Sequence, residues 1–172
     1  MRIINLIVVH CSATREDCAL SPEALDAMHR RRGFAGTGYH YYIRRDGTLH
    51  LTRPLERIGA HAKGFNANSV GICYEGGLDC RGRPADTRTA AQRTALRRLI
   101  GQLQEAFPGC RVCGHRDLSP DRNGNGVIEP DEWTKRCPCF DAEKEYGENV
   151  PECAGSTSKQ PFKERKGGKL WQ

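Results

Sequence analysis

The sequence predicts a single α/β domain in which helices flank a central mixed β-sheet. Short β-branched runs alternate with helix-patterned segments along the chain, and no internal repeat interrupts that order. The 172 residues suit one hydrophobic core with a short appendage. Charged residues make up 28% and hydrophobic residues 37%, and this composition excludes a wholly disordered chain.

The first half of the chain is predicted to contain a strand, a helix and a hairpin. Ile3 to Val9 is an almost unbroken β-branched run, typical of a buried strand, and it brings His10 to the strand's end. Ser21, followed by proline and glutamate, predicts the N-cap of a helix that runs to position 33. Tyr39 to Arg45 and Thr48 to Arg53 have strand composition, and the Asp-Gly pair between them predicts a tight hairpin turn.

A second buried strand and a long helix follow. Ser69 to Glu75 predicts a strand with a glycine inside it. Thr89 and Gln92 form a capping box at the start of a helix. The apolar positions of that helix fall on one stripe, which comprises Leu96, Leu99, Ile100, Leu103 and Phe107.

The last predicted strand, Cys110 to Cys113, brings His115 to a polar loop, much as the first strand brings His10 to its end. After about residue 150 the chain becomes rich in Pro, Gly, Ser and Lys without periodicity. We therefore expect one domain over residues 1–150 and a flexible basic tail over residues 151–172.

The net charge of +6 suggests an anionic partner, but five basic and two acidic residues in the tail already supply +3. Such a stretch is usually a solvated extension, with attraction to nucleic acid or to an acidic wall polymer as the alternative. The nine cysteines cannot all pair within one chain, so reduced thiols or metal ligands are expected rather than a disulfide framework. We expect a monomer that does not bind nucleic acid.

The longest apolar run, around Leu6 to Val9, is too short to cross a bilayer and lacks the cleavage region of a signal peptide. Synthesis is therefore expected to end in the cytoplasm. Any action outside the cell would follow release by lysis or by specialised secretion.

Two of the predicted strands end in a histidine, and sites in open α/β sheets are usually built at strand ends. His10 and His115 can therefore converge on one metal ion, although each taken singly is more often a hydrogen-bonded histidine than a ligand. Cys137, in the run Lys135 to Cys139, offers a thiolate beside a cation. Two histidines and one cysteine leave a fourth zinc position open, which is a catalytic rather than a structural pattern.

Several motifs occur in one order along the chain. They are Val9-His10-Cys11-Ser12-Ala13-Thr14, Gly38-Tyr39-His40, Arg45-Asp46-Gly47-Thr48, His61-Ala62-Lys63-Gly64, Asn68-Ser69-Val70-Gly71, Gly114-His115 and Lys135 to Asp141. Together they resemble the phage lysozyme-type N-acetylmuramoyl-L-alanine amidases, a family that also includes the peptidoglycan recognition proteins. The resemblance extends to about residue 145.

The resemblance implies that His10, His115 and Cys137 bind zinc and that Tyr39 and Lys135 are the catalytic pair. Zinc would polarise the scissile carbonyl and activate a water that hydrolyses the amide between N-acetylmuramic acid and L-alanine. Lys135 would stabilise the developing oxyanion. Tyr39 would orient the water and help to pass a proton to the leaving nitrogen.

The resemblance also implies a groove for bacterial peptidoglycan, lined by His61 with Lys63 and Asn68 nearby. Without the motif around it, Tyr39 would be interpreted as a strand aromatic in the core. The groove residues carry no independent signal of their own in the sequence.

The chain departs from the phage pattern by an insertion of about a dozen residues between His115 and Lys135. Residues 121–132 match the oxygen-ligand loop of EF-hand proteins, D-x-[DN]-x-[DN]-G-x5-E. The expected Ca²⁺ ligands are Asp121, Asn123, Asn125, the Val127 carbonyl, Glu129 directly or through water, and Glu132. A proline directly before the motif argues against a full entering helix, so a lone structural calcium loop is predicted, with a polar turn as the alternative. We expect calcium to fix Lys135 and Cys137 relative to His115.

Two other functions fit parts of the sequence. A catalytically inactive peptidoglycan-binding module would keep the groove, but competent residues occupy all three ligand positions and both catalytic positions. A structural four-cysteine zinc site from Cys110, Cys113, Cys137 and Cys139, on a basic nucleic-acid binder, would leave the histidine motifs unused. A zinc amidase is therefore the primary interpretation.

Overall fold

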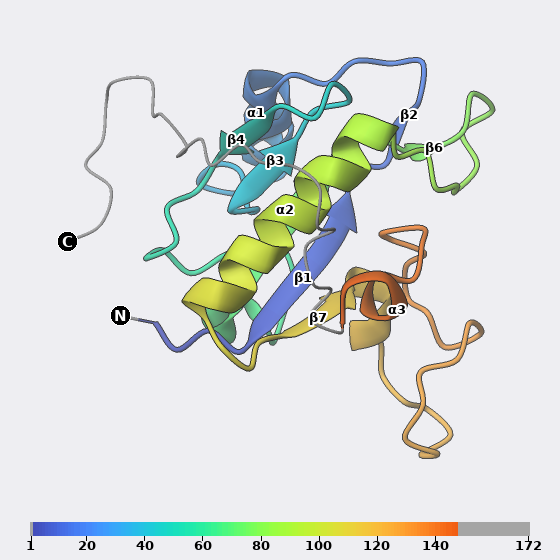
Figure 1. Ribbon diagram of the computed structural model, residues 1–172. Coiled ribbons are helices and arrows are strands. Elements are labelled where there is room, and N and C mark those ends of the chain that lie inside the picture. The colour runs from blue at the N-terminus through green and yellow to red at the C-terminus, as the bar shows by residue number, and fades with distance from the viewer. Residues whose placement is uncertain (1, 148–172) are drawn as a thin grey trace, which may run out of the picture.

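The computed structural model describes residues 2–147, so the predicted domain end near residue 150 and the basic tail lie outside the described residues. The main strands are β1 (Leu6–Cys11), β3 (Tyr41–Ile43), β4 (Leu49–Leu51), β5 (Ser69–Tyr74) and β7 (Arg111–Gly114). They form one sheet with the order β4-β3-β5-β1-β7 (Figure 1). All neighbours are parallel except β3 and β4, which form the predicted antiparallel hairpin. The predicted α/β domain with a central mixed sheet is confirmed.

A second, two-stranded sheet joins β2 (Thr14–Arg15) to β6 (Gly77–Leu78). The pairing is parallel, and the chain reaches it directly after β1 and β5. Strands of two residues carry too little pattern for the sequence to predict them. This small sheet extends the contact between the β1 and β5 segments beyond the main sheet.

The central strand begins later than the β-branched run suggests. Its pairing begins where Leu6 meets Ser69 on one side and Arg111 on the other, so both partner strands start opposite Leu6. Ile3 therefore lies outside the sheet and is 83% exposed. At its other end β1 continues through His10 to Cys11, so His10 lies within the strand rather than after it.

The three α-helices within residues 2–147 are α1 (Pro22–Arg31), α2 (Ala90–Ala106) and α3 (Ala142–Tyr146). Both predicted helix starts are confirmed, because the Ser21 hydroxyl accepts the Ala24 N–H and Thr89 forms a complete capping box with Gln92. The short α3 is preceded by its N-cap Asp141, whose carboxylate accepts the Lys144 N–H. None of the helices over residues 2–147 combines the length and apolar character needed to cross a membrane.

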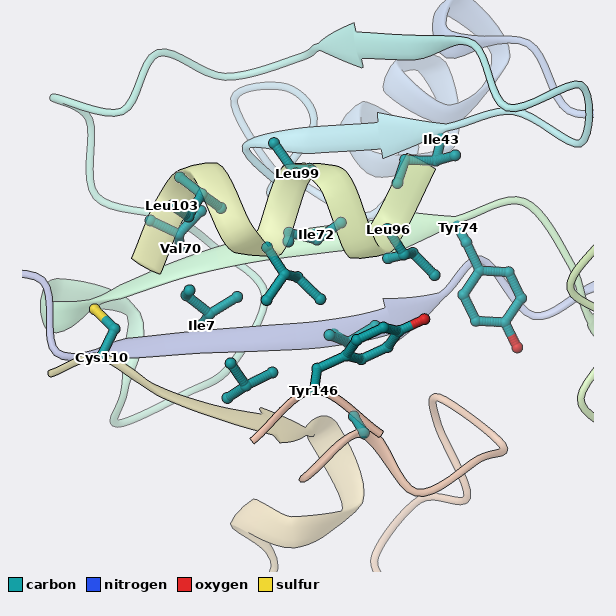
Figure 2. Close-up of a cluster of buried hydrophobic side chains, with 14 of the residues drawn as sticks. Ile7, Ile43, Val70, Ile72, Tyr74, Leu96, Leu99, Leu103, Cys110 and Tyr146 are labelled. Carbon is teal, nitrogen blue, oxygen red and sulfur yellow. The ribbon is translucent and has the colours of Figure 1, made fainter. Parts of the chain in front are cut away.

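The core lies between the sheet and α2, which crosses one face of it (Figure 1). Figure 2 shows the predicted stripe of α2 packed on strand residues; among those labelled are Leu96, Leu99, Leu103, Ile7, Val70 and Ile72. Side chains alternate across a strand, so Leu6, Val8 and His10 point to the face away from α2. Leu6 and Val8 there join a separate buried cluster, and α1 packs farther along the same face. The candidate site therefore lies on the face opposite α2.

Candidate metal centre

The two predicted histidine ligands lie side by side although 105 residues separate them. Val9 on β1 pairs with Gly114, the last residue of β7, and a histidine follows each of them in the chain. The imidazole centroids of His10 and His115 are 4.6 Å apart. His10 is buried and His115 is half-buried at the start of a short 3-10 helix, His115–Leu118. The parallel pairing of β1 with β7 is what brings these side chains together.

Cys137 approaches the histidines from a loop that is held on several sides. The Cys11 N–H donates to Cys137 Sγ at 3.3 Å, and the Arg116 N–H donates to the Cys137 carbonyl at 2.8 Å. The next residue, Pro138, packs on Gly114, where an added Cβ would come within 2.5 Å of the proline ring. The Tyr74 hydroxyl donates to the Pro138 carbonyl at 2.7 Å. The thiol position thus depends on both central strands.

These three residues form a group whose nitrogen and sulfur atoms fit zinc. One donor atom from each of His10, His115 and Cys137 lies within 4.8 Å of the others, and His10 Nδ1 is 3.8 Å from Cys137 Sγ. Tetrahedral zinc with bond lengths of about 2.0–2.3 Å separates its ligand atoms by roughly 3.5 Å. Among the residues that the structure describes, no other histidine, cysteine or carboxylate group of this size is brought so close.

Burial keeps the site histidines in the neutral form that binds metals. Burial lowers the pKa of His10 well below its ordinary value, and the nearby His61, His115 and Lys135 lower it further. Burial likewise lowers the pKa of His115 to about 4, with the charge of Lys135 as the second cause. A hydrogen bond with Cys137 is the main reason that the pKa of the Cys11 thiol is raised to about 12, so Cys11 stays protonated.

Both predicted catalytic residues lie beside this group. The Tyr39 ring is 5.0 Å from the His10 ring and 5.3 Å from the His29 ring, between centroids. Burial chiefly raises the pKa of the Tyr39 phenol well above its ordinary value, so the hydroxyl can donate at neutral pH. Lys135 is exposed, and its charge is close enough to lower the pKa values of His10 and His115.

The three predicted groove residues occupy different places. His61 lies in the site, with its Nδ1 3.0 Å from His10 Nε2. Lys63 is exposed. Asn68 donates to the Asn5 side chain at 2.6 Å. It lines a surface hollow of about 420 Å³ together with Asn5, Leu6, Phe65, Arg111, Asp117, Leu118 and Ser119. The structure thus brings His61 to the metal centre and places Asn68 at the opposite end of the strands.

The insertion over residues 121–132 folds as a loop whose predicted ligands cap its own backbone. The Asp121 carboxylate accepts the N–H groups of Gly124 and Gly126. Glu132 is buried and accepts the N–H groups of Arg122, Asn123 and Glu129. Asn123 and Asn125 accept N–H groups two residues ahead, and Val127 is exposed. Calcium binding by these residues stays a prediction.

The insertion is joined to the metal centre at its base. The Thr134 N–H donates to Ser119 Oγ at 3.0 Å, which closes the loop. The Arg116 guanidinium lies 4.2 Å from the centroid of the Trp133 ring, and Arg116 also holds the Cys137 carbonyl. Movement at the base of the loop would therefore reach Cys137 and His115.

The four-cysteine alternative is wrong because its cysteines point to opposite faces of the sheet. Cys110 belongs to the cluster under α2, and its thiol donates to the Ile4 carbonyl. Cys113 belongs to the cluster on the other face with Leu6 and Val8. The cysteines within the described residues are free thiols, as expected.

Sequence reasoning missed the residues that support the ligands. Nothing in the residue pattern marks the Cys11 backbone N–H as a donor to Cys137. Gly71 and Gly114 are different, because a glycine in or beside a buried strand often marks a close approach of another group. Gly71 admits the His61 ring and Gly114 admits Pro138.

Comparison with known proteins places the chain in a family. The model of the N-acetylmuramoyl-L-alanine amidase family matches residues 1–138. The chain is 36% identical over 143 residues to the endolysin of Klebsiella phage KP32, covering 83% of this chain and 85% of that protein. It is 51% identical over 96 residues to an uncharacterised protein of Haemophilus influenzae, covering 56% of this chain and 83% of that protein. The solved N-acetylmuramoyl-L-alanine amidase LysC from Clostridium intestinale shares its fold with a TM-score of 0.63 at 29% identity, over 83% of this chain and 80% of that one. The chain therefore belongs to the N-acetylmuramoyl-L-alanine amidase family.

Proposed function

We propose that this chain is a zinc-dependent amidase that hydrolyses the bond between N-acetylmuramic acid and the L-alanine of the peptidoglycan stem. The observation that carries the proposal is the convergence of His10, His115 and Cys137 within 4.8 Å, with Tyr39 beside them. Family membership supports the choice of substrate. The protein would act on the cell wall after release by lysis or specialised secretion, as a monomer.

Each residue of the site has a defined task in this proposal. His10, His115 and Cys137 would hold zinc, which when bound supplies a Lewis acid for the scissile carbonyl and lowers the pKa of a water. The ammonium of Lys135 would stabilise negative charge that develops on the carbonyl oxygen. The protonated phenol of Tyr39 would orient the attacking water and help to transfer a proton to the leaving L-alanine nitrogen.

Release of stem peptides tests the proposal directly. Purified peptidoglycan is incubated with zinc-loaded wild type, Cys137→Ala or Cys110→Ala, and new L-alanine amino termini are counted. Wild type and Cys110→Ala should release stems, and Cys137→Ala should not. Cys110 is the matched control because its thiol lies under α2 and away from the site.

Two other outcomes would contradict the proposal. Equal release by wild type and Cys137→Ala would overturn the assignment of the third ligand. Binding of peptidoglycan by wild type without any release would instead support a binding module without turnover.

We also propose that residues 121–132 bind one Ca²⁺ ion in a structural role. The spacing of oxygen donors supports this, as does the buried Glu132 at the last position of the motif. The ligands would be Asp121, Asn123, Asn125, the Val127 carbonyl, Glu129 and Glu132. Calcium would hold the base of the loop, where Trp133 packs on Arg116, and so stabilise the position of Cys137.

A further inference from the structure

His61 contacts His10, which is one of the predicted zinc ligands. Its Nδ1 lies 3.0 Å from His10 Nε2, and the two rings meet edge to face with centroids 5.1 Å apart. We propose that His61 is a positioning residue that holds His10 in the tautomer whose Nδ1 is free to bind zinc. The inference rests on the proposed zinc centre and changes the role expected for His61 from the sequence.

The tautomer follows from which atom each ring nitrogen faces. His10 Nδ1 faces Cys137 Sγ at 3.8 Å, so Nδ1 is the nitrogen on the metal side. An imidazole that binds metal through Nδ1 carries its proton on Nε2. His10 Nε2 then donates to His61 Nδ1, which must be an unprotonated acceptor.

The other nitrogen of His61 continues the same chain of hydrogen bonds. With Nδ1 acting as acceptor, the His61 proton resides on Nε2, which lies 3.4 Å from the hydroxyl of the buried Ser69. The path therefore runs from His10 through His61 to Ser69. Because both ring nitrogens face protein partners, neither is left to recognise substrate.

The position of His61 is itself strongly constrained. The Asn66 side-chain oxygen accepts the backbone N–H groups of His61 and Ala62, each at 2.9 Å. A Cβ added at either Gly59 or Gly71 would come within 2.5 Å of the imidazole. The imidazole therefore fits a space that exists only because positions 59 and 71 are glycines. Such a constraint is expected of a group that orients a metal ligand.

A matched pair of variants tests the inference by zinc affinity. Asn and Leu have similar shapes, but only His61→Asn keeps an acceptor near the position of Nδ1. Loss of a partner that orients a ligand typically costs about 10–100-fold in metal affinity. In competition with a chromophoric chelator, His61→Leu should bind zinc about 10–100-fold more weakly than wild type, and His61→Asn should recover most of that loss. At saturating zinc, the KM of His61→Leu for a soluble muramoyl peptide should be unchanged.

The outcomes separate this inference from the proposed function. Equal zinc affinity of wild type and His61→Leu would overturn the positioning role, and a raised KM with unchanged zinc affinity would assign His61 to substrate instead. If folded wild type binds zinc no better than His10→Ala does, both the proposed metal centre and this inference are overturned.

A second test needs no variant. A histidine-selective ¹⁵N spectrum of zinc-loaded wild type should show that His10 and His61 are both protonated at Nε2. Ligation of His10 through Nε2 would overturn the inference.

Discussion

Gly71 lies directly beneath His61, and a Cβ built on Gly71 would come within 2.5 Å of the imidazole Cδ2. Both residues are close to fixed structure, because Gly71 is in the middle of β5 and its N–H donates to His40 Nδ1. Gly71 cannot move away without disturbing β5, and the Asn66 side chain holds the backbone of His61. The candidate metal centre therefore depends on the absence of a side chain at position 71.

Gly71→Ala should reduce zinc affinity and stem-peptide release by at least about 10-fold, because displacement of His61 releases its hold on His10. Chelator competition and L-alanine end counting measure both effects. Gly101→Ala is the control, since a Cβ there meets nothing within 4 Å and alanine stabilises a helix by about 0.5–1 kcal/mol. A Gly71→Ala protein with wild-type zinc affinity would contradict the steric argument.

Tyr39→Phe should lower kcat by about 10²–10⁴-fold, because it removes the proton-transfer group and keeps the ring beside His10. Zinc affinity should stay within about two-fold of wild type, since the phenol is not a ligand. Steady-state kinetics on a soluble muramoyl peptide, with zinc content measured in parallel, provide the test. Tyr41→Phe, whose ring packs on the core side, serves as the control. Wild-type kcat in Tyr39→Phe would remove Tyr39 from the mechanism.

Arg88→Met should destabilise the fold by about 1–3 kcal/mol, because it removes a buried guanidinium and its charge-assisted hydrogen bonds to Asp86 and Glu145, both of which keep Arg93 as a partner. The Arg88 side chain is 1% exposed, pairs with Asp86 and Glu145, and lies 3.2 Å from the Phe140 ring centroid. Arg83, whose exposed side chain pairs with Asp79, is the control, and Arg83→Met should cost about 0–1 kcal/mol. Urea unfolding measures both values. Similar losses in the two variants would show that Arg88 is no more than a surface charge.

Acid should weaken the fold through His40. Burial lowers its pKa from 6.5 to about 4, and its Nδ1 accepts the Gly71 N–H, which a protonated ring cannot do. A depressed folded-state pKa means that the stabilisation is complete above pH 6.5 and is lost as the pH falls toward 4. The maximum contribution is roughly 3 kcal/mol.

Urea unfolding at pH 7 and pH 5 tests this effect. His40→Asn keeps an acceptor for Gly71 but does not titrate, so its stability should fall less than that of wild type between the two pH values. The histidines of the candidate metal centre are present in both proteins, and the difference between the two pH profiles isolates His40. Parallel pH profiles would contradict the assignment.

Calcium should raise the melting temperature of wild type by roughly 5–10 °C at about 100 times its Kd. Glu132→Ala should lower the melting temperature and activity and abolish this response, because Glu132 also accepts three backbone N–H groups of the loop. Asp131→Asn, an exposed neighbour outside the ligand positions, should respond like wild type. Differential scanning calorimetry with calcium or EGTA gives the comparison. Identical wild-type melting in both would reject the calcium site.

Local signals in the sequence predicted most elements of this fold. Ser21 and the Thr89 capping box locate the helix starts because their hydrogen bonds involve residues within one turn. The start of β1 could not be predicted in the same way, since it depends on where Ser69 and Arg111 begin to pair. Similarly, α3 depends on the distant Arg88, which binds Glu145 and Tyr146.

The candidate site was predictable to a different degree. The two strand-end histidines suggest a shared metal, but their juxtaposition requires β1 and β7 to be neighbours, which no local pattern specifies. Cys137 and Tyr39 were identified through the family resemblance, because a loop cysteine and a tyrosine just before a strand are individually common. The contact of His61 with His10 was not predicted, since it is a relation between a loop and a strand that only packing defines.

The central position of β1 determines when the candidate site can form during synthesis. Leu6 pairs with Ser69 and Arg111, which both lie later in the chain, so β1 leaves the ribosome before either partner strand has been made. His10 must also meet Cys137, which lies later in the chain than both partner strands. A nascent chain therefore cannot assemble the candidate metal centre before Cys137 has been synthesised.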